Sequence, residues 1–80
     1  MYYVYIIKSL SFENKIYTGR TSDLKKRLAD HNAGATFHTA KYLPWQLVVY
    51  FGIEDFEKAT KFEKYLKSGS GRAFIKKRFL

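Results

Sequence analysis

A single carboxylate lies on the apolar face of an expected helix. The segment 55–67 predicts a helix whose apolar stripe consists of Phe56, Ala59, Phe62 and Leu66. Glu63 falls inside this stripe, and because an unpaired buried carboxylate is costly, it needs a cationic partner. One interpretation is a structural ion pair with Lys67 or with a basic residue elsewhere in the chain. The other is a ligand for a hard divalent cation such as Mg²⁺, which prefers oxygen donors.

A basic pair lies on an earlier expected helix. Residues 23–32 predict this helix, because good N-cap residues precede Leu24 and Gly34 follows as a stop. Arg27 and His31 lie four residues apart, beside the face that carries Leu24. They form either a half-exposed basic pair that extends past the core or a phosphate clamp. In a clamp, Arg27 would supply a rigid two-pronged donor, and His31 a second donor or a proton carrier.

Two tyrosines form the third candidate group. Tyr5 and Tyr17 are expected in adjacent strands, where a tyrosine is usually a packing residue. A phenol acts instead as a general base where nearby cations lower its pKa. Arg20 and Arg27 are the cations that would do so here, and both interpretations stay open.

The strands that must position these residues belong to an α+β fold. Strands are expected over residues 2–8, 15–18 and 46–53. The first two form an antiparallel hairpin, in which Gly19 ends the second strand. Both faces of the first strand are apolar, which is typical of a central strand covered on two sides.

The remaining segments predict the helices around this sheet. Residues 35–45 indicate an irregular connection, and residues 68–71 should break the helix that begins near Asp55. Residues 72–80 then predict a short basic helix. The expected architecture is a small three-stranded antiparallel β-sheet flanked by helices, in the order β-β-α-β-α(-α), in which the last helix is optional.

Composition excludes several classes of protein. A chain of 80 residues allows one domain, 1–80. Its 46% hydrophobic and 19% aromatic content excludes general disorder. The absence of cysteine excludes disulfides, cysteine zinc sites and thiol nucleophiles. No apolar run approaches the roughly 20 residues of a membrane span, and the first residues lack the features of a signal peptide, so a cytoplasmic protein is expected.

Charge indicates a polyanionic partner. The net charge of +8 favours nucleic acid first and an anionic membrane second. The cationic residues expected to contact nucleic acid are Arg20, Lys25, Lys26, Lys67, Arg72, Lys76, Lys77 and Arg78. Residues 72–79 interleave basic and aromatic side chains, which also fits an amphipathic helix that docks on the core and leaves its charges in solvent.

Taken in order, these residues resemble the GIY-YIG nuclease superfamily. The motifs that carry the resemblance are Tyr3-Val4-Tyr5, Tyr17-Thr18-Gly19, Asp23-Leu24 and Arg27-x-x-x-His31-Asn32. Glu63 falls where this family places its metal-binding glutamate, and Arg20 where it often has a basic residue. The resemblance covers nearly the whole chain. It is closest to the small stand-alone members and to the N-terminal endonuclease domain of UvrC, a DNA-repair nuclease.

The sequence departs from the family pattern at a few positions. Tyr3, Val4 and Thr18 replace the usual residues of the two half-motifs, at positions that vary in the family. Several members also have an asparagine after the metal-binding glutamate, and this chain has none there. The residues that would replace its phosphate contact are Ser68, Ser70 or Arg72, and the sequence does not choose among them.

The resemblance implies one-metal hydrolysis of a phosphodiester. Glu63 would hold Mg²⁺ or Mn²⁺, and Arg27 would neutralise charge on the phosphate while His31 assists by hydrogen bonding. Tyr5 would be the base that activates water and Tyr17 the second tyrosine of the site, although their roles are exchangeable. Gly19 would allow a tight turn and a close approach of the phosphate.

The expected function is therefore that of a metal-dependent endonuclease acting on DNA. It would be monomeric, with no membrane partner and no small-molecule cofactor. A second hypothesis is a nucleic-acid-binding module on the same scaffold with little or no turnover. A third, a peripheral membrane protein, leaves Glu63 on the apolar face unexplained. Because a domain of this size has little surface for reading bases, low sequence specificity is expected.

Overall fold

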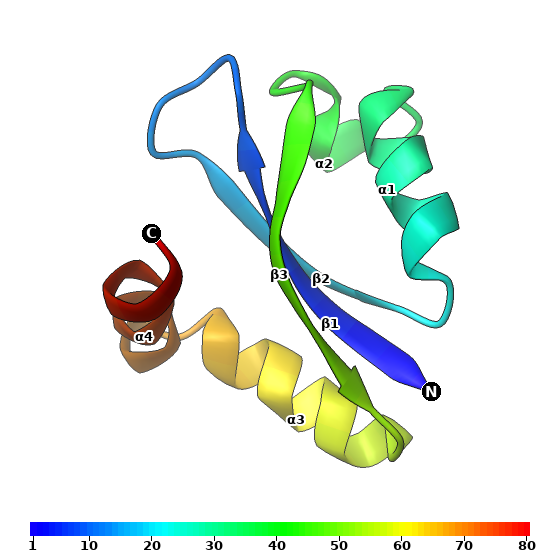
Figure 1. The fold of residues 1–80 in the computed structure, drawn as a ribbon, viewed down its shortest axis with the longest axis vertical. Helices are drawn as coiled ribbons and strands as arrows, with labels where there is room; N and C mark the ends of the chain where they lie inside the picture. The colour runs from blue at the N-terminus through cyan, green and yellow to red at the C-terminus, as the bar shows by residue number, and fades with distance from the viewer.

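A three-stranded antiparallel sheet forms the centre of the molecule (Figure 1). The computed structural model describes residues 1–80. The strands are β1 (Tyr2–Ser9), β2 (Ile16–Thr21) and β3 (Trp45–Ile53), in the spatial order β2-β1-β3. The helices are α1 (Leu24–Asn32), α2 (Phe37–Ala40), α3 (Phe56–Leu66) and α4 (Gly69–Phe79). The predicted α+β class and the order β-β-α-β-α-α are confirmed.

Helices cover both faces of the sheet. Figure 1 shows α1 and α2 on one face, and α3 and α4 on the other. On the α3 face, Val4 and Ile6 are fully buried in one core cluster, whose helical members are Ala59, Leu66 and Ile75. On the α1 face, Tyr5, Ile7 and Trp45 form a second cluster. The two-sided burial predicted for the first strand is confirmed, and it follows from the uninterrupted apolar run of β1.

Helices α1 and α3 both begin at aspartate caps. The side chain of Asp23 accepts a hydrogen bond from the backbone of Lys26 at the start of α1. Asp55 accepts in the same way from the backbone of Glu57 and Lys58 at the start of α3. These caps satisfy amide groups that the first turn of a helix leaves without an internal partner. The predicted bounds of both helices are confirmed to within a residue.

Strand β2 is longer than the sequence predicts. Gly19 was expected to end it, but the strand continues through Gly19 to Thr21, and Gly19 pairs with Tyr5 in the ladder. Gly19 therefore lies in extended backbone and forms no turn. The expectation of a tight turn at this glycine is wrong.

Helix α4 begins earlier than predicted. Residues 68–71 were expected to break the preceding helix, yet only Lys67 and Ser68 separate α3 from α4. The Ser68 hydroxyl caps α4 by accepting from the backbone of Gly71. A side chain at Gly71 would overlap the backbone of Tyr65, so the glycine lets the first turn of α4 lie directly on the end of α3. The segment 35–45, expected to be irregular, also contains the short helix α2.

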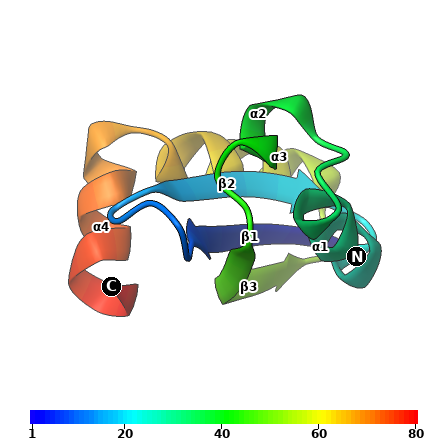
Figure 2. The same ribbon diagram turned by 90° about the horizontal axis from the view of Figure 1, so that it is seen from above.

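The ends of the sheet differ in what surrounds them. Figure 2 shows β1 between β2 and β3, with α4 at one end of the sheet beside the connection from β1 to β2. Strand β2 has a neighbour on one side only, so its outer edge is free of strand pairing.

None of the helices has the length and apolar character needed to cross a membrane.

Candidate active site

Tyr5 and Gly19 form the base of the candidate site. They are direct partners across β1 and β2, and Tyr5 is 1% exposed. A Cβ at position 19 would overlap the hydroxyl and ring of Tyr5. The glycine therefore makes room for the Tyr5 phenol above the strand, which is a packing reason for this residue that its position in the sequence did not reveal.

His31 holds the Tyr5 hydroxyl from helix α1. The Oη atom of Tyr5 lies 2.7 Å from Nε2 of His31, and Nδ1 of His31 lies 2.7 Å from Oγ1 of Thr39. His31 is fully buried, so the interpretation of a half-exposed basic pair is wrong for this residue. Thr39 in turn donates to the carbonyl of Thr36. Because the Thr39 hydroxyl donates to that carbonyl, its oxygen accepts from Nδ1–H of His31. The unprotonated Nε2 of His31 then accepts from the Tyr5 hydroxyl.

Both rings of this pair have shifted pKa values. Burial, together with the nearby Arg27 cation, lowers the pKa of His31 from 6.5, while Asp30 acts in the opposite direction. His31 is therefore neutral at pH 7. Burial raises the pKa of Tyr5 to about 12, with a further increase from Tyr17, and Arg27 offsets only part of this. The expected lowering of the Tyr5 pKa by cations is wrong, because burial outweighs them.

Tyr17 lies beside this hydrogen-bonded pair. Its ring centroid is 5.2 Å from that of His31 and 6.5 Å from that of Tyr5. The side chain is half-buried and packs against the α1 core cluster. The two tyrosines and the histidine are thus brought together as predicted, although only Tyr5 has a hydrogen bond to the imidazole.

Arg27 presents an unsatisfied donor next to the tyrosines. Its Nε atom is buried and has no hydrogen-bond partner. The cation is close enough to Tyr5 and His31 to shift the pKa of each. A buried N–H group without a partner is costly, and native proteins rarely keep one without a use. Because the Nε atom is out of contact with solvent, only the rest of the half-buried guanidinium can offer a donor to an external anion.

Glu63 reaches the same region from the opposite face of the sheet. Its Oε2 lies 3.1 Å from Nζ of Lys67, and its Oε1 lies 3.6 Å from Nη1 of Arg20. The predicted ion pair with Lys67 is therefore present. Arg20 is itself held by a hydrogen bond to Thr60. Burial is the main reason that the pKa of Tyr5 is raised, and the Glu63 carboxylate adds the smallest of the contributions, in the same direction.

Glu63 is the one site residue suited to hold a divalent cation. The chain contains no group of three or more His, Cys, Asp or Glu side chains that would form a metal site by themselves. Mg²⁺ commonly keeps several waters and takes one or two carboxylates together with substrate phosphates. The Glu63 side chain is 18% exposed, so it is partly open to solvent. A single-carboxylate site completed by water and phosphate fits this arrangement.

A comparison with known protein families agrees with this arrangement. A family model described as the GIY-YIG catalytic domain matches residues 1–78. The chain belongs to the GIY-YIG family. The resemblance noted from the motifs is thereby confirmed over nearly the whole length. Membership indicates a nuclease-type hydrolase that acts on nucleic acid.

Several curated relatives of this GIY-YIG domain come from one bacterial species. The UPF0213 proteins of Streptococcus pyogenes serotype M3 (strain ATCC BAA-595 / MGAS315) and of serotype M1 are each 38% identical to it over 72 residues. The alignment covers 89% of this chain and 76% of each relative. Their names state no activity, so they support the family and add nothing on metal or substrate.

The basic residues predicted to bind nucleic acid fall into separate groups on this GIY-YIG domain. Lys67, Arg72 and Lys76 line one hollow together with Tyr17. Lys25 and Lys26 lie exposed on α1, where Lys26 pairs with Asp30. Lys77 and Arg78 are exposed on α4 and do not line the hollow, and Arg20 contacts Glu63 from β2. These residues do not form one continuous cluster.

Sequence reasoning missed Thr39 and the positioning role of Asn32, which it had quoted only as part of the motif on α1. Thr39 fixes the His31 ring from α2, a helix that the sequence did not predict. Asn32 fixes the end of α1, because its amide group exchanges two hydrogen bonds with the Trp45 backbone, at 2.6 and 3.0 Å. The indole of Trp45 then donates to the carbonyl of Thr39. A polar pair, Thr36 and Thr39, at helical spacing was the one available signal in that segment.

Proposed function

We propose that this GIY-YIG domain is a divalent-metal-dependent endonuclease that hydrolyses phosphodiester bonds in DNA. The observation that carries the proposal is the buried hydrogen-bonded chain from Tyr5 through His31 to Thr39. This chain offers a proton path from the phenol to a neutral imidazole. Packing alone requires no such path, since a phenylalanine would fill the same space without a polar group to satisfy.

Proton transfer would run along this chain. An attacking water would give a proton to Oη of Tyr5 as Tyr5 passes its own proton to Nε2 of His31. The raised pKa of Tyr5, about 12, disfavours a free phenolate, and the concerted transfer avoids forming one. Thr39 would keep Nδ1 protonated and Nε2 free to accept. After the water oxygen bonds to phosphorus, the leaving oxygen departs and takes a proton from solvent.

Arg27 and Glu63 would bind the charged groups of the reaction. Arg27 would donate from the terminal nitrogens of its half-buried guanidinium to a non-bridging phosphate oxygen, since its Nε atom is out of contact with solvent. Glu63 would hold Mg²⁺ or Mn²⁺, and the bound cation would neutralise charge on the phosphate and on the leaving oxygen. Lys67 and Arg20, which now contact Glu63, would turn to the phosphates of the strand.

The net charge supports a polyanionic substrate. The chain carries +8, and the exposed lysines and arginines of α1, α3 and α4 contribute most of it. Arg72 is the best placed of the three candidates for the phosphate contact that an asparagine makes in other members. Ser68 is already engaged as the cap of α4, and Ser70 does not line the hollow that contains Arg72.

One observation favours the alternative of a binding module without turnover. Both oxygens of Glu63 already contact cations, as in a structural ion pair. The discriminating experiment incubates the protein with labelled single- and double-stranded DNA in Mg²⁺, in Mn²⁺ and in EDTA. An endonuclease cleaves with metal and stops in EDTA. A binding module retains the DNA equally in all three conditions and leaves it intact.

A further inference from the structure

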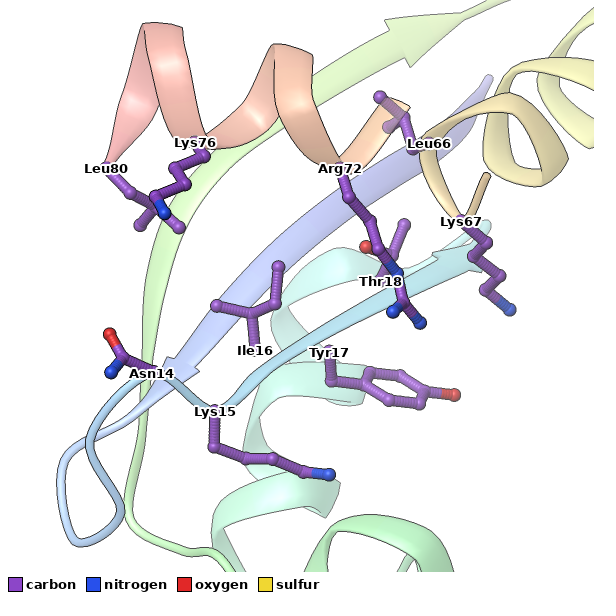
Figure 3. Close-up of a pocket in the computed structure, with 10 residues that line it drawn as sticks. All are labelled: Asn14, Lys15, Ile16, Tyr17, Thr18, Leu66, Lys67, Arg72, Lys76 and Leu80. Atoms are coloured by element: carbon purple, nitrogen blue, oxygen red, sulfur yellow. The ribbon is translucent and has the colours of Figure 1, made fainter. Parts of the chain in front are cut away.

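A hollow of about 690 Å³ lies at the free edge of β2 (Figure 3). Its walls are residues 14–18, the end of α3 and one side of α4. In Figure 3 the side chain of Arg72 extends from α4 toward Thr18 on β2, while Lys76 and Leu80 lie side by side further along the helix. The volume is within the range of about 300–1,000 Å³ that is typical of small-molecule sites.

The lining combines cations with an apolar floor. Four cationic side chains, Lys15, Lys67, Arg72 and Lys76, line the hollow, and no carboxylate does. Apolar surface between them comes from residues such as Ile16. Inorganic phosphate would leave the apolar surface without a contact, and a wholly apolar ligand would leave the cations unpaired. The lining is therefore complementary to an anion that also carries a less polar body.

The hollow adjoins the candidate active site. Tyr17 lines the hollow, and its ring also packs against His31. Lys67 lines the hollow as well, and its ammonium contacts Glu63 at 3.1 Å. A strand whose phosphate lies between Arg27 and Glu63 would therefore pass its neighbouring nucleotide toward this hollow. Tyr17 and Lys67 thus link the hollow to the candidate active site.

We propose that the hollow binds one unpaired nucleotide of the substrate strand, next to the phosphodiester that is cleaved. Arg72 and Lys76 contact its phosphate, and Ile16 packs against its base. This inference rests on the proposed function and adds a substrate class to it. A base in a duplex is stacked and paired, so only a base outside a duplex enters a hollow of this kind. The preferred substrate is then single-stranded DNA or a duplex with an unpaired segment beside the cleavage point.

The direct test measures binding without catalysis. The backbone amides of the Glu63→Gln variant are followed by NMR in EDTA, while deoxyadenosine monophosphate, deoxyribose 5-phosphate or inorganic phosphate is added. The proposal predicts saturable shifts at residues 14–18 and 69–76 with the nucleotide, and affinity about tenfold weaker for the two probes that lack a base. Equal affinity for all three would reduce the hollow to a simple anion site and overturn the proposal.

Matched variants distinguish binding in the hollow from attraction by the net charge of the protein. The double variant Arg72→Gln, Lys76→Gln removes two charges from the hollow, and Lys58→Gln, Lys61→Gln removes two exposed charges of α3 that do not line it. Nucleotide affinity should fall about tenfold in the first and stay within about twofold in the second. Equal losses in both would show that net charge alone attracts the nucleotide, and the proposal would fail. Competition by a short acidic peptide as strong as that of the nucleotide would also overturn it.

A cleavage measurement tests the unpaired base itself. Single-stranded oligonucleotides with one abasic position on either side of the cut bond are compared with the intact strand and with the full duplex in Mg²⁺. The proposal predicts the fastest cleavage of the intact single strand and a loss at one abasic position only. Absence of cleavage with nucleotide binding intact would refute the proposed nuclease function but not the nucleotide site in the hollow. Cleavage at the same rate with either abasic position would refute the nucleotide site alone.

Discussion

The hydroxyl of Tyr5 lies 2.7 Å from Nε2 of His31, although the two residues are 26 positions apart and neither is exposed to solvent. The strand that carries Tyr5 and the helix that carries His31 meet only because both pack on the same core cluster, with Tyr17 beside them. In the proposed mechanism, this hydrogen bond carries the proton from the phenol to the imidazole. Next to the larger effect of burial, Arg27 acts on the pKa of both rings, while Glu63 pairs with Arg20 on β2.

Thr39 should control the rate through the orientation of His31. Thr39→Val removes the hydroxyl at Nδ1 and keeps the shape, so the imidazole loses the partner that selects its tautomer. We expect kcat for DNA cleavage to fall about tenfold or more, with KM nearly unchanged. Thr39→Ser should restore most of the rate. Thr36→Val is the matched control on the same segment, because the Thr36 side chain makes no capping hydrogen bond. Equal rates for the Thr39→Val and Thr36→Val variants would show that Thr39 does not control the rate through His31.

Arg27 should be irreplaceable by lysine. Lysine keeps the charge but lacks the planar fork, and it has no equivalent of the Nε donor that is buried without a partner. Loss of one preorganised donor of this kind costs about 10²–10³ in rate, so Arg27→Lys should cleave DNA correspondingly more slowly. Binding of DNA in EDTA should change little, since the charge is retained. Cleavage within about twofold of the parent rate would disprove the phosphate clamp.

Stability should decrease in acid because of His31. Its pKa in the folded protein lies below the ordinary 6.5 of the unfolded chain, because burial disfavours the imidazolium. Above pH 6.5 both states are neutral; as the pH falls below 6.5, the unfolded chain binds a proton first, so folding loses free energy. The loss from one residue is at most about 1.4 kcal/mol per pH unit. Urea unfolding at pH 7.5 and 5.5 measures it, with His31→Asn and the exposed His38→Gln as variants. The pH effect should shrink in the first and persist in the second; the reverse pattern would refute the assignment.

Binding of DNA should depend steeply on salt. If four to six phosphates are contacted, the logarithm of the binding constant should fall with the logarithm of the salt concentration, at a slope of roughly −3 to −5. Replacement of Lys76, Lys77 and Arg78 by glutamine should flatten that slope and weaken binding to all sequences alike. The metal dependence of any residual cleavage should stay as it is. A slope left unchanged by the triple variant would move the contact surface toward Arg20, Lys25 and Lys26.

The strands and the helices α1 and α3 were predictable because their signals are local. The apolar run of β1 and the caps at Asp23 and Asp55 act within a few residues of themselves. The start of α4 was not predictable in this way. A Ser-Gly-Ser-Gly segment has low helix propensity, and its helical form depends on the contact of Gly71 with the end of α3. Tertiary packing therefore determines where α4 begins.

The candidate site likewise contains residues that local signals identify and residues that only tertiary contacts identify. The spacing of Arg27 and His31 and the place of Glu63 on an apolar stripe identified three of its residues as unusual. Their partners depend on contacts between distant segments. The bond from Thr39 to His31 spans two helices, and the room that Gly19 leaves for Tyr5 spans two strands. The raised pKa of Tyr5 is likewise a result of burial, which no local pattern reports.

The most direct test of the central claim is DNA cleavage by the Glu63→Gln variant beside the parent protein, in Mg²⁺, in Mn²⁺ and in EDTA. Glutamine keeps the shape of the side chain and removes the charge that would hold the cation. The account predicts cleavage by the parent with either metal, none in EDTA, and a collapse of the rate in the variant. DNA binding and the unfolding midpoint should stay close to the parent values. Full Mg²⁺-dependent cleavage by Glu63→Gln, or equal cleavage by the parent in EDTA, would contradict the account.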